Sequence, residues 1–124
     1  MTVLRAQRLI ACVLLLPVVA QIQGCKGSTS LENVSVALRN TETYQYPTVG
    51  GDEEGATIVL QPTHYSISEM RRDATTNWIA TYVYRPAAGF VGKDEAVIEI
   101  STGSDGASAP TDIKRVAFRF DVRN

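Results

Sequence analysis

One histidine, one run of acids and two cysteines are the side chains of this sequence with the chemistry that catalysis, metal binding or covalent modification requires. His64 lies in a strand-like stretch, and as a general base it would need a nucleophile that only the fold brings to it. Neither Gly-x-Ser-x-Gly nor His-Glu-x-x-His occurs in the sequence. We expect a surface or strand-edge histidine in a protein that is not an enzyme. A hydrolase that uses His64 with the acids of the loop 47–55 is the weaker alternative.

The acidic run consists of Asp52, Glu53 and Glu54, in a loop flanked by glycines. Carboxylate oxygens on such loops suit hard cations such as Ca²⁺, but the alternating ligands of an EF-hand loop are absent from the sequence. We expect a solvated loop tip, no metal and no cofactor.

Aromatic side chains are numerous for a chain of this size, and most of them have the spacing of core strands. Tyr44 and Tyr46 are the exceptions, because they stand just before Pro47 and its long loop. If exposed, they form a binding surface. The competing expectation is that both rings pack beneath the loop 47–55.

The first 24 residues have the composition of a targeting segment. Arg5 and Arg8 precede an apolar run at 9–16. Even when it is extended to Ala20, this run falls short of the ~20 residues that cross a bilayer. We therefore expect 1–24 to be removed as a signal peptide.

The residues at the end of this segment are Ile22, Gln23, Gly24 and Cys25, and they resemble the lipobox of bacterial lipoproteins. The resemblance implies cleavage before Cys25 and acylation of that residue with fatty acids such as palmitate, so that membrane lipid anchors the protein in the cell envelope. Lys26 replaces the Asp that marks retention at the inner membrane. The resemblance thus implies the outer membrane, facing the periplasm in a Gram-negative cell.

Ordinary secretory cleavage after Ala20 is the alternative, because the small residues at 18 and 20 suit the general signal peptidase. The product would be a secreted, unanchored subunit or inhibitor with a free thiol at Cys25. Cys12 is lost with the signal in both cases. No intramolecular disulfide is therefore expected, and hydrophobic burial must stabilise the fold.

The mature chain carries little net charge. All 13 acids but only 10 of the 12 Lys and Arg residues follow the signal, which leaves a net charge of −3. Apart from the pairs at 71–72 and 114–115, the cations are scattered singly. Nucleic-acid-binding surfaces gather their cations, so we expect no nucleic-acid partner.

Apolar residues after position 30 recur mainly with period two, which predicts strands. Six strands are expected, at 33–38, 56–60, 64–68, 77–84, 96–100 and 116–122. The continuous apolar run at 56–60 predicts burial on both faces, and the bulk on both faces of 77–84 predicts a central strand. One short helical turn is expected within 68–74. We expect a tether at 25–30 and a single all-β domain at 31–124.

The stretch 84–94 carries a pattern of its own, Tyr84-x-Pro86 followed by Gly89-Phe90-x-Gly92-x-Asp94. The pattern and the alternating strand after it resemble the immunoglobulin-like and cadherin-like modules of bacterial envelope proteins. The resemblance implies an immunoglobulin-like antiparallel β-sandwich, in which this stretch turns the chain from one sheet to the other. Phe90 would close the end of that sandwich.

The signal, the strand pattern and the lack of a catalytic set together predict a small lipid-anchored envelope protein that acts as a non-enzymatic binding or scaffolding module. Its expected partners are membrane lipid, through acylated Cys25, and an envelope protein or polysaccharide. The secreted subunit or inhibitor is the alternative.

Overall fold

The computed structural model describes residues 27–48, 55–103 and 109–124. In these ranges the chain forms seven strands and one 3₁₀ turn. The elements are β1 (Ser28–Arg39), β2 (Tyr44–Pro47), β3 (Gly55–Leu60), β4 (Tyr65–Arg71), η1 (Ala74–Thr76), β5 (Thr81–Pro86), β6 (Gly92–Thr102) and β7 (Asp112–Arg123).

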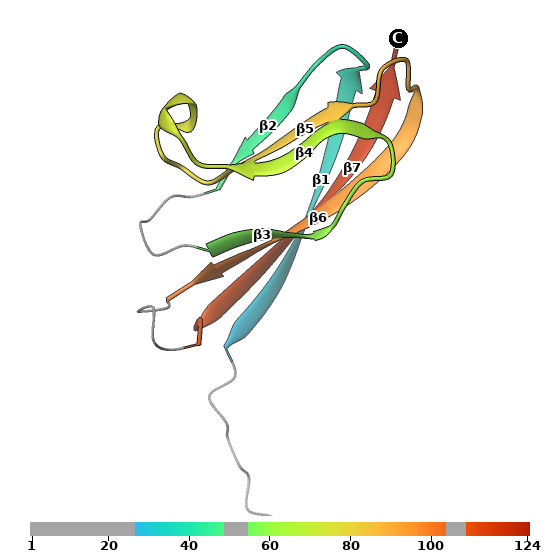
Figure 1. Ribbon diagram of the computed structural model, residues 1–124. Helices are drawn as coiled ribbons and strands as arrows, with labels where there is room; N and C mark the ends of the chain where they lie inside the picture. Colours follow the sequence, from blue (N-terminus) through green and yellow to red (C-terminus); the bar gives the residue numbers. More distant parts are fainter. Residues whose placement is uncertain (1–26, 49–54, 104–108) are drawn as a thin grey trace, which may run out of the picture.

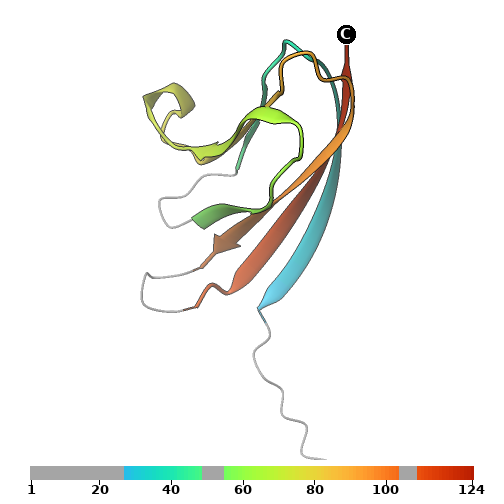
Figure 2. The same cartoon turned by 45° about the vertical axis from the view of Figure 1, so that its right-hand side comes forward.

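The strands form two sheets that pack face to face (Figures 1 and 2). The large sheet has the order β1-β7-β6-β3 and the small sheet the order β2-β5-β4. If the seven strands are lettered A to G in chain order, the two sheets have the orders A-G-F-C and B-E-D. This is an immunoglobulin-like arrangement with the first strand on the larger sheet. The predicted all-β sandwich is confirmed. One pair departs from the antiparallel expectation, because β1 runs parallel to β7.

Alternation of side chains decides which face of the large sheet is buried. In β7, Val116, Phe118, Phe120 and Val122 are buried, while Arg115 and Arg119 between and beside them are exposed. Ala96, Ile98 and Ile100 of β6 are buried in the same way. These apolar positions face the small sheet, as their period-two spacing predicts.

An aromatic cluster joins the two sheets. Phe118 and Phe120 of β7 stack on Tyr82 and Tyr84 of β5, with ring centroids 5.1 and 3.9 Å apart. Burial raises the pKa of Tyr82 to about 12, so its phenol stays protonated, and Ser68 shares a hydrogen bond of 3.0 Å with it. The position of β5 between β2 and β4 confirms the prediction of a central strand.

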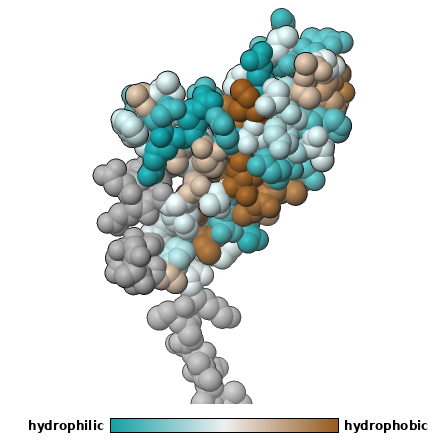
Figure 3. Space-filling model, in the orientation of Figure 1, coloured by the Kyte–Doolittle hydropathy of each residue, from teal (hydrophilic) through white to brown (hydrophobic). Residues whose placement is uncertain are grey.

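Two expectations about local structure are wrong. Residues 56–60 were expected to be covered on both faces, but β3 is an edge strand on which Val59 and Leu60 are exposed. Apolar surface is accordingly visible where β3 meets β6 (Figure 3). The helical turn expected within 68–74 begins only at Ala74, because β4 continues through Arg71 and pairs with β5 there.

The large sheet is longer than the small one and extends beyond it at the end where β1 begins (Figures 1 and 2). β1 starts at Ser28, within the stretch expected as a tether, and is paired with β7 from that residue on. The C-terminus lies at the opposite end of the sandwich (Figure 1). Among the described residues, none of the elements is a helix long and apolar enough to span a membrane.

Candidate functional site

The most exposed large apolar side chain among the described residues is that of Trp78, with 68% of its surface accessible. It belongs to the connection between β4 and β5, which projects from the body of the sandwich (Figure 1). Charged and polar residues gather around this connection (Figure 3). A large aromatic ring in polar surroundings has the character of an interface anchor.

Hydrogen bonds fix this connection from within. Asp73 caps η1, since its carboxylate accepts from the amide and the hydroxyl of Thr75. The Thr75 hydroxyl is the main cause of a lowered pKa of Asp73. Thr76 closes the capping box by accepting from the Asp73 amide at 3.1 Å, and the Trp78 amide donates to the Asp73 carbonyl at 2.9 Å. The turn therefore holds its shape without a partner.

The small sheet holds the end of the same turn. Both the amide and the hydroxyl of Thr48, a buried residue that follows β2, donate to the carbonyl of Ala80, at 2.9 and 2.7 Å. Ala80 itself is buried. The segment that follows Trp78 is thus hydrogen-bonded to the end of β2 and continues into β5.

The backbone at the tip is strained. Asn77 and Trp78 have φ angles of +51° and +62°, in the left-handed region. Asn is tolerated there, but a bulky residue is an outlier that costs of order 1–3 kcal/mol. Strain of this kind persists where surrounding bonds over-determine the conformation, and it is concentrated at functional sites. We therefore take the Trp78 turn, residues 73–78, as the candidate binding site.

The sequence pattern misplaced Trp78 in the core. Its spacing with Ala80, Tyr82 and Tyr84 predicts one strand from 77 onward, but β5 begins at Thr81. The left-handed conformations at 77 and 78 turn the chain out of the strand. An available signal was the cluster of turn formers at 73–77, in which Asp and Thr have the spacing of a helix cap.

Tyr44 and Tyr46 are half-buried. Their rings meet Phe118 edge to face, with centroid distances of 5.9 and 5.1 Å. The pKa of Tyr44 is raised, chiefly by burial. Packing against the core therefore buries part of each ring. That the two tyrosines also contact a partner stays a prediction.

His64 is exposed, and its ring stacks on Phe90 with centroids 4.2 Å apart. The ring Nδ1 lies 2.8 Å from the hydroxyl of Thr63, which also donates to the carboxylate of Asp94 at 3.2 Å. A nucleophilic triad needs the histidine between the hydroxyl and the acid. Here the hydroxyl lies between the other two groups, so this trio has the wrong order for a triad.

Asp94 explains the sequence pattern at 84–94. Its buried carboxylate accepts from the amides of Thr63, His64 and Glu95 at 2.8–3.0 Å, and from the hydroxyl of Tyr84 at 3.3 Å. Burial opposes the ionisation of this carboxyl, but the hydrogen bonds outweigh it and hold its pKa below the ordinary value. Burial and the neighbouring carboxylate both raise the pKa of Tyr84. Together these groups fasten the β3–β4 connection to β6.

The predicted closing role of Phe90 agrees with its packing against the core cluster. Gly89 and Gly92, on either side of Phe90, have φ angles of +76° and +144°. L side chains rarely adopt such angles, so both positions of the turn require glycine.

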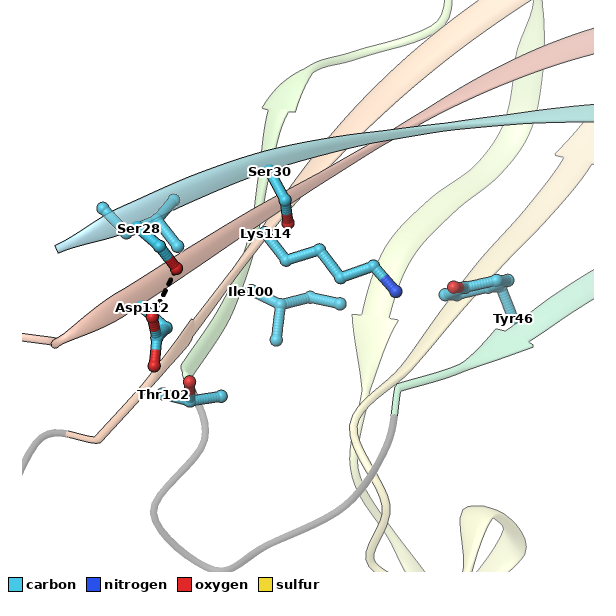
Figure 4. A pocket seen from close by; sticks show the side chains of 8 residues that line it. Ser28, Ser30, Tyr46, Ile100, Thr102, Asp112 and Lys114 are labelled. Carbon is cyan, nitrogen blue, oxygen red and sulfur yellow. Dashed lines mark hydrogen bonds between the residues drawn. The ribbon is translucent and has the colours of Figure 1, made fainter.

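A cavity of about 170 Å³ opens where the large sheet extends beyond the small one (Figure 4). Tyr46 and Ile100 contribute to its lining. Its two charged lining residues are both engaged by β1, since Asp112 accepts from the hydroxyl of Ser28 and Lys114 pairs with Glu32. Because these charges are already paired, we assign the cavity no ligand.

Several predicted residues lie outside the described ranges. They are Ile22, Gln23, Gly24, Cys25 and the acids at 52–54. Among the described residues, no group of three or more His, Cys, Asp and Glu side chains is placed to hold a metal ion.

Comparisons with known proteins give limited guidance. No family model matches the chain, and no curated protein matches it at a significant level. The cysteine protease inhibitor EhICP2 from Entamoeba histolytica is a similar solved structure, with a TM-score of 0.46 and 12% identity over 77% of this chain and 97% of that one. A sialyltransferase from Photobacterium damsela has a TM-score of 0.39 and 11% identity, over 77% of this chain and 18% of that one. The function must therefore be argued from this chain's own surface.

Proposed function

We propose that this chain is a small lipid-anchored protein of the bacterial cell envelope, which binds another envelope component through the Trp78 turn and catalyses no reaction. The observation that carries the proposal is the exposure of Trp78 on a turn whose strained conformation is fixed by hydrogen bonds. The signal segment and the lipobox resemblance at 22–25 support the anchor.

A tryptophan on a fixed turn is well suited to binding. Tryptophan is enriched among the residues that dominate the energy of protein interfaces. Because the turn is already ordered, binding does not have to supply the free energy of ordering it. Asn77, an exposed polar residue that precedes Trp78 in the chain, can hydrogen-bond a protein or a polysaccharide.

Photocrosslinking in the native envelope tests the site. A benzoylphenylalanine residue in place of Trp78 is expected to form an adduct with an envelope component in the full-length protein. The same residue in place of Val91, an exposed apolar position on the connection before β6, is the matched control and should give no such adduct. Equal adducts from both positions, or none from position 78, would refute the site.

The sole tryptophan of the chain gives a second readout. Addition of the crosslinked component should shift the emission of Trp78 to shorter wavelength, because binding removes the ring from water. Trp78→Ala is expected to weaken binding at least thirtyfold, about 2 kcal/mol or more for an anchor residue. The melting temperature should not fall, since the substitution removes an exposed side chain.

Lipid attachment is tested separately. The wild-type protein is expected to carry the mass of its acyl chains and to partition into detergent, whereas Cys25→Ser should be soluble and unmodified. A soluble wild-type protein that begins at Gln21 would contradict the anchor and support ordinary secretory cleavage.

A secreted inhibitor is the second candidate, and the same turn favours it. Enzyme–inhibitor complexes form with little change of backbone, and a fixed, projecting turn meets that requirement. Inhibition assays against serine, cysteine and metalloproteases would separate this candidate from an envelope-binding module. Loss of inhibition in Trp78→Ala, with inhibition retained in Val91→Ala, would support it.

A further inference from the structure

The outer face of the large sheet carries charges in a regular pattern. On this face the register pairs Lys93 with Asp121, Glu95 with Arg119, and Glu99 with Arg115, always from β6 to β7. The first and last of these pairs are ion pairs of 3.0 and 2.9 Å. Between them Val97 pairs with Ala117 in an apolar row. No other described element packs over this face, because the small sheet covers the opposite one.

This pattern is complementary to itself. A two-fold axis parallel to the strands and midway between β6 and β7 places β6 of one copy over β7 of a second copy, row by row. Each charged row then faces the opposite sign: Lys93 over Asp121, Glu95 over Arg119 and Glu99 over Arg115. Val97 lies over Ala117 at the centre.

The other two-fold arrangement is unfavourable. An axis across the strands, through the row of Val97, would place β6 over β6. Glu95 of one copy would then face Glu99 of the other, and Arg119 would face Arg115. Like charges held opposite each other in this way are repulsive.

Exposed apolar residues at both edges of the face fit the same axis. Leu60 is paired with Val97 and lies on β3, at one edge, with 44% of its surface exposed. Leu31 lies on β1, at the other edge, with 65% exposed. The axis parallel to the strands brings β3 of one copy over β1 of the other. Both leucines would then be covered along the rim of the interface.

We propose that this chain forms a two-fold dimer through the outer face of its large sheet, with β6 of each copy over β7 of the other. Two sheets packed in this way keep their strands within about 30° of each other. Nine residues from each of β1, β7 and β6 and the six residues of β3, on strands ~4.8 Å apart, give a face of roughly 500–600 Å² in each copy. The total of about 1,100 Å² is at the low end for specific interfaces, so the dimer should dissociate on dilution.

The axis also fits the proposed lipid anchor, and this part of the argument rests on the proposed function. An axis parallel to the strands leaves both copies pointing the same way, so both β1 strands begin at the same end. The three residues from Cys25 to Gly27 span at most about 11 Å. Both anchors would therefore reach the same bilayer, whereas the axis across the strands would put them at opposite ends.

A charge exchange tests the interface and its axis. The variant combines Glu95→Arg, Arg119→Glu, Glu99→Arg and Arg115→Glu, which keeps every pair within the sheet and is expected to melt close to the wild-type temperature. Two differently tagged full-length copies are produced together, and their co-purification is measured. Wild type with wild type, and variant with variant, should associate. Wild type with variant should associate at least tenfold more weakly, because like charges then face each other in both rows.

The remaining outcomes overturn the proposal. Mixed pairs that associate as well as matched pairs would refute the charge-complementary axis, and matched wild-type pairs that fail to associate would refute the dimer. Sedimentation of Cys25→Ser in solution separates the dimer from the anchor. A reversible dimer in that variant supports the interface whether or not the wild type is lipidated, while a monomer at high concentration overturns it.

Discussion

Phe118→Ala is expected to lower the free energy of unfolding by about 3–5 kcal/mol, the largest single effect that the structure predicts. The side chain is fully buried and contacts three rings from two strands of the small sheet, namely Tyr82 of β5 and Tyr44 and Tyr46 of β2. Its removal would leave a cavity at the point where the two sheets meet. Urea unfolding measured by circular dichroism gives the value.

The expected loss is a large part of the 5–15 kcal/mol by which native domains are stable, so the variant should be partly unfolded near body temperature. Val91→Ala is the matched control. Its side chain is about half exposed, and its loss should change the stability by less than about 0.5 kcal/mol. A loss below about 1 kcal/mol in Phe118→Ala would show that the aromatic cluster does not join the sheets as described.

Asp94→Asn is expected to destabilise the fold at pH 7 by about 2–4 kcal/mol. The carboxylate accepts three backbone amides and two hydroxyls, and an amide group presents a donor where one of its oxygens now accepts. Buried donors left without an acceptor each cost about 1–3 kcal/mol. Asp112→Asn, at an exposed carboxylate that accepts from Ser28, is the control and should have a small effect.

The same substitution should change the response to acid. Because the folded pKa of Asp94 is below the ordinary value near 3.9, its contribution is complete above that value. It is lost as the pH falls through the lower folded pKa. Stability measured from pH 6 to pH 2.5 should therefore fall more steeply in the wild type than in Asp94→Asn.

Asp73 and Asp121 also have lowered pKa values, through the Thr75 hydroxyl and the Arg123 guanidinium respectively. Both groups are present in the wild type and in Asp94→Asn. The difference between the two curves of stability against pH therefore reports the contribution of Asp94 alone. Parallel curves would mean that Asp94 has no role in acid unfolding.

Local alternation was enough to predict most of the fold. Val116, Phe118, Phe120 and Val122 are separated by polar residues, and only a half-buried strand accounts for that pattern. β2 was missed because Tyr44–Pro47 is too short to show a period. The parallel pairing of β1 could not be predicted, since Ser28 meets a partner 84 positions away.

The candidate site could not be predicted from the sequence, because the alternation of large and small side chains typical of a strand continues into the turn. The alternation of 78, 80, 82 and 84 has no visible break at Trp78, and only the backbone angles at 77 and 78 separate the turn from the strand. The charge rows on the large sheet were equally hidden. Glu95 and Arg119 become neighbours only once the register of β6 and β7 is known.

The parallel pairing of β1 and β7 also determines how the domain responds to mechanical force. The chain enters β1 at one end of the sandwich and leaves β7 at the other (Figure 1). A pull between the start of β1 and the C-terminus therefore acts along both strands and slides one past the other. The load is shared by all 12 register positions from Ser28 to Arg39, instead of opening them one at a time as in a hairpin. This geometry favours a domain that stays folded under tension between its two ends.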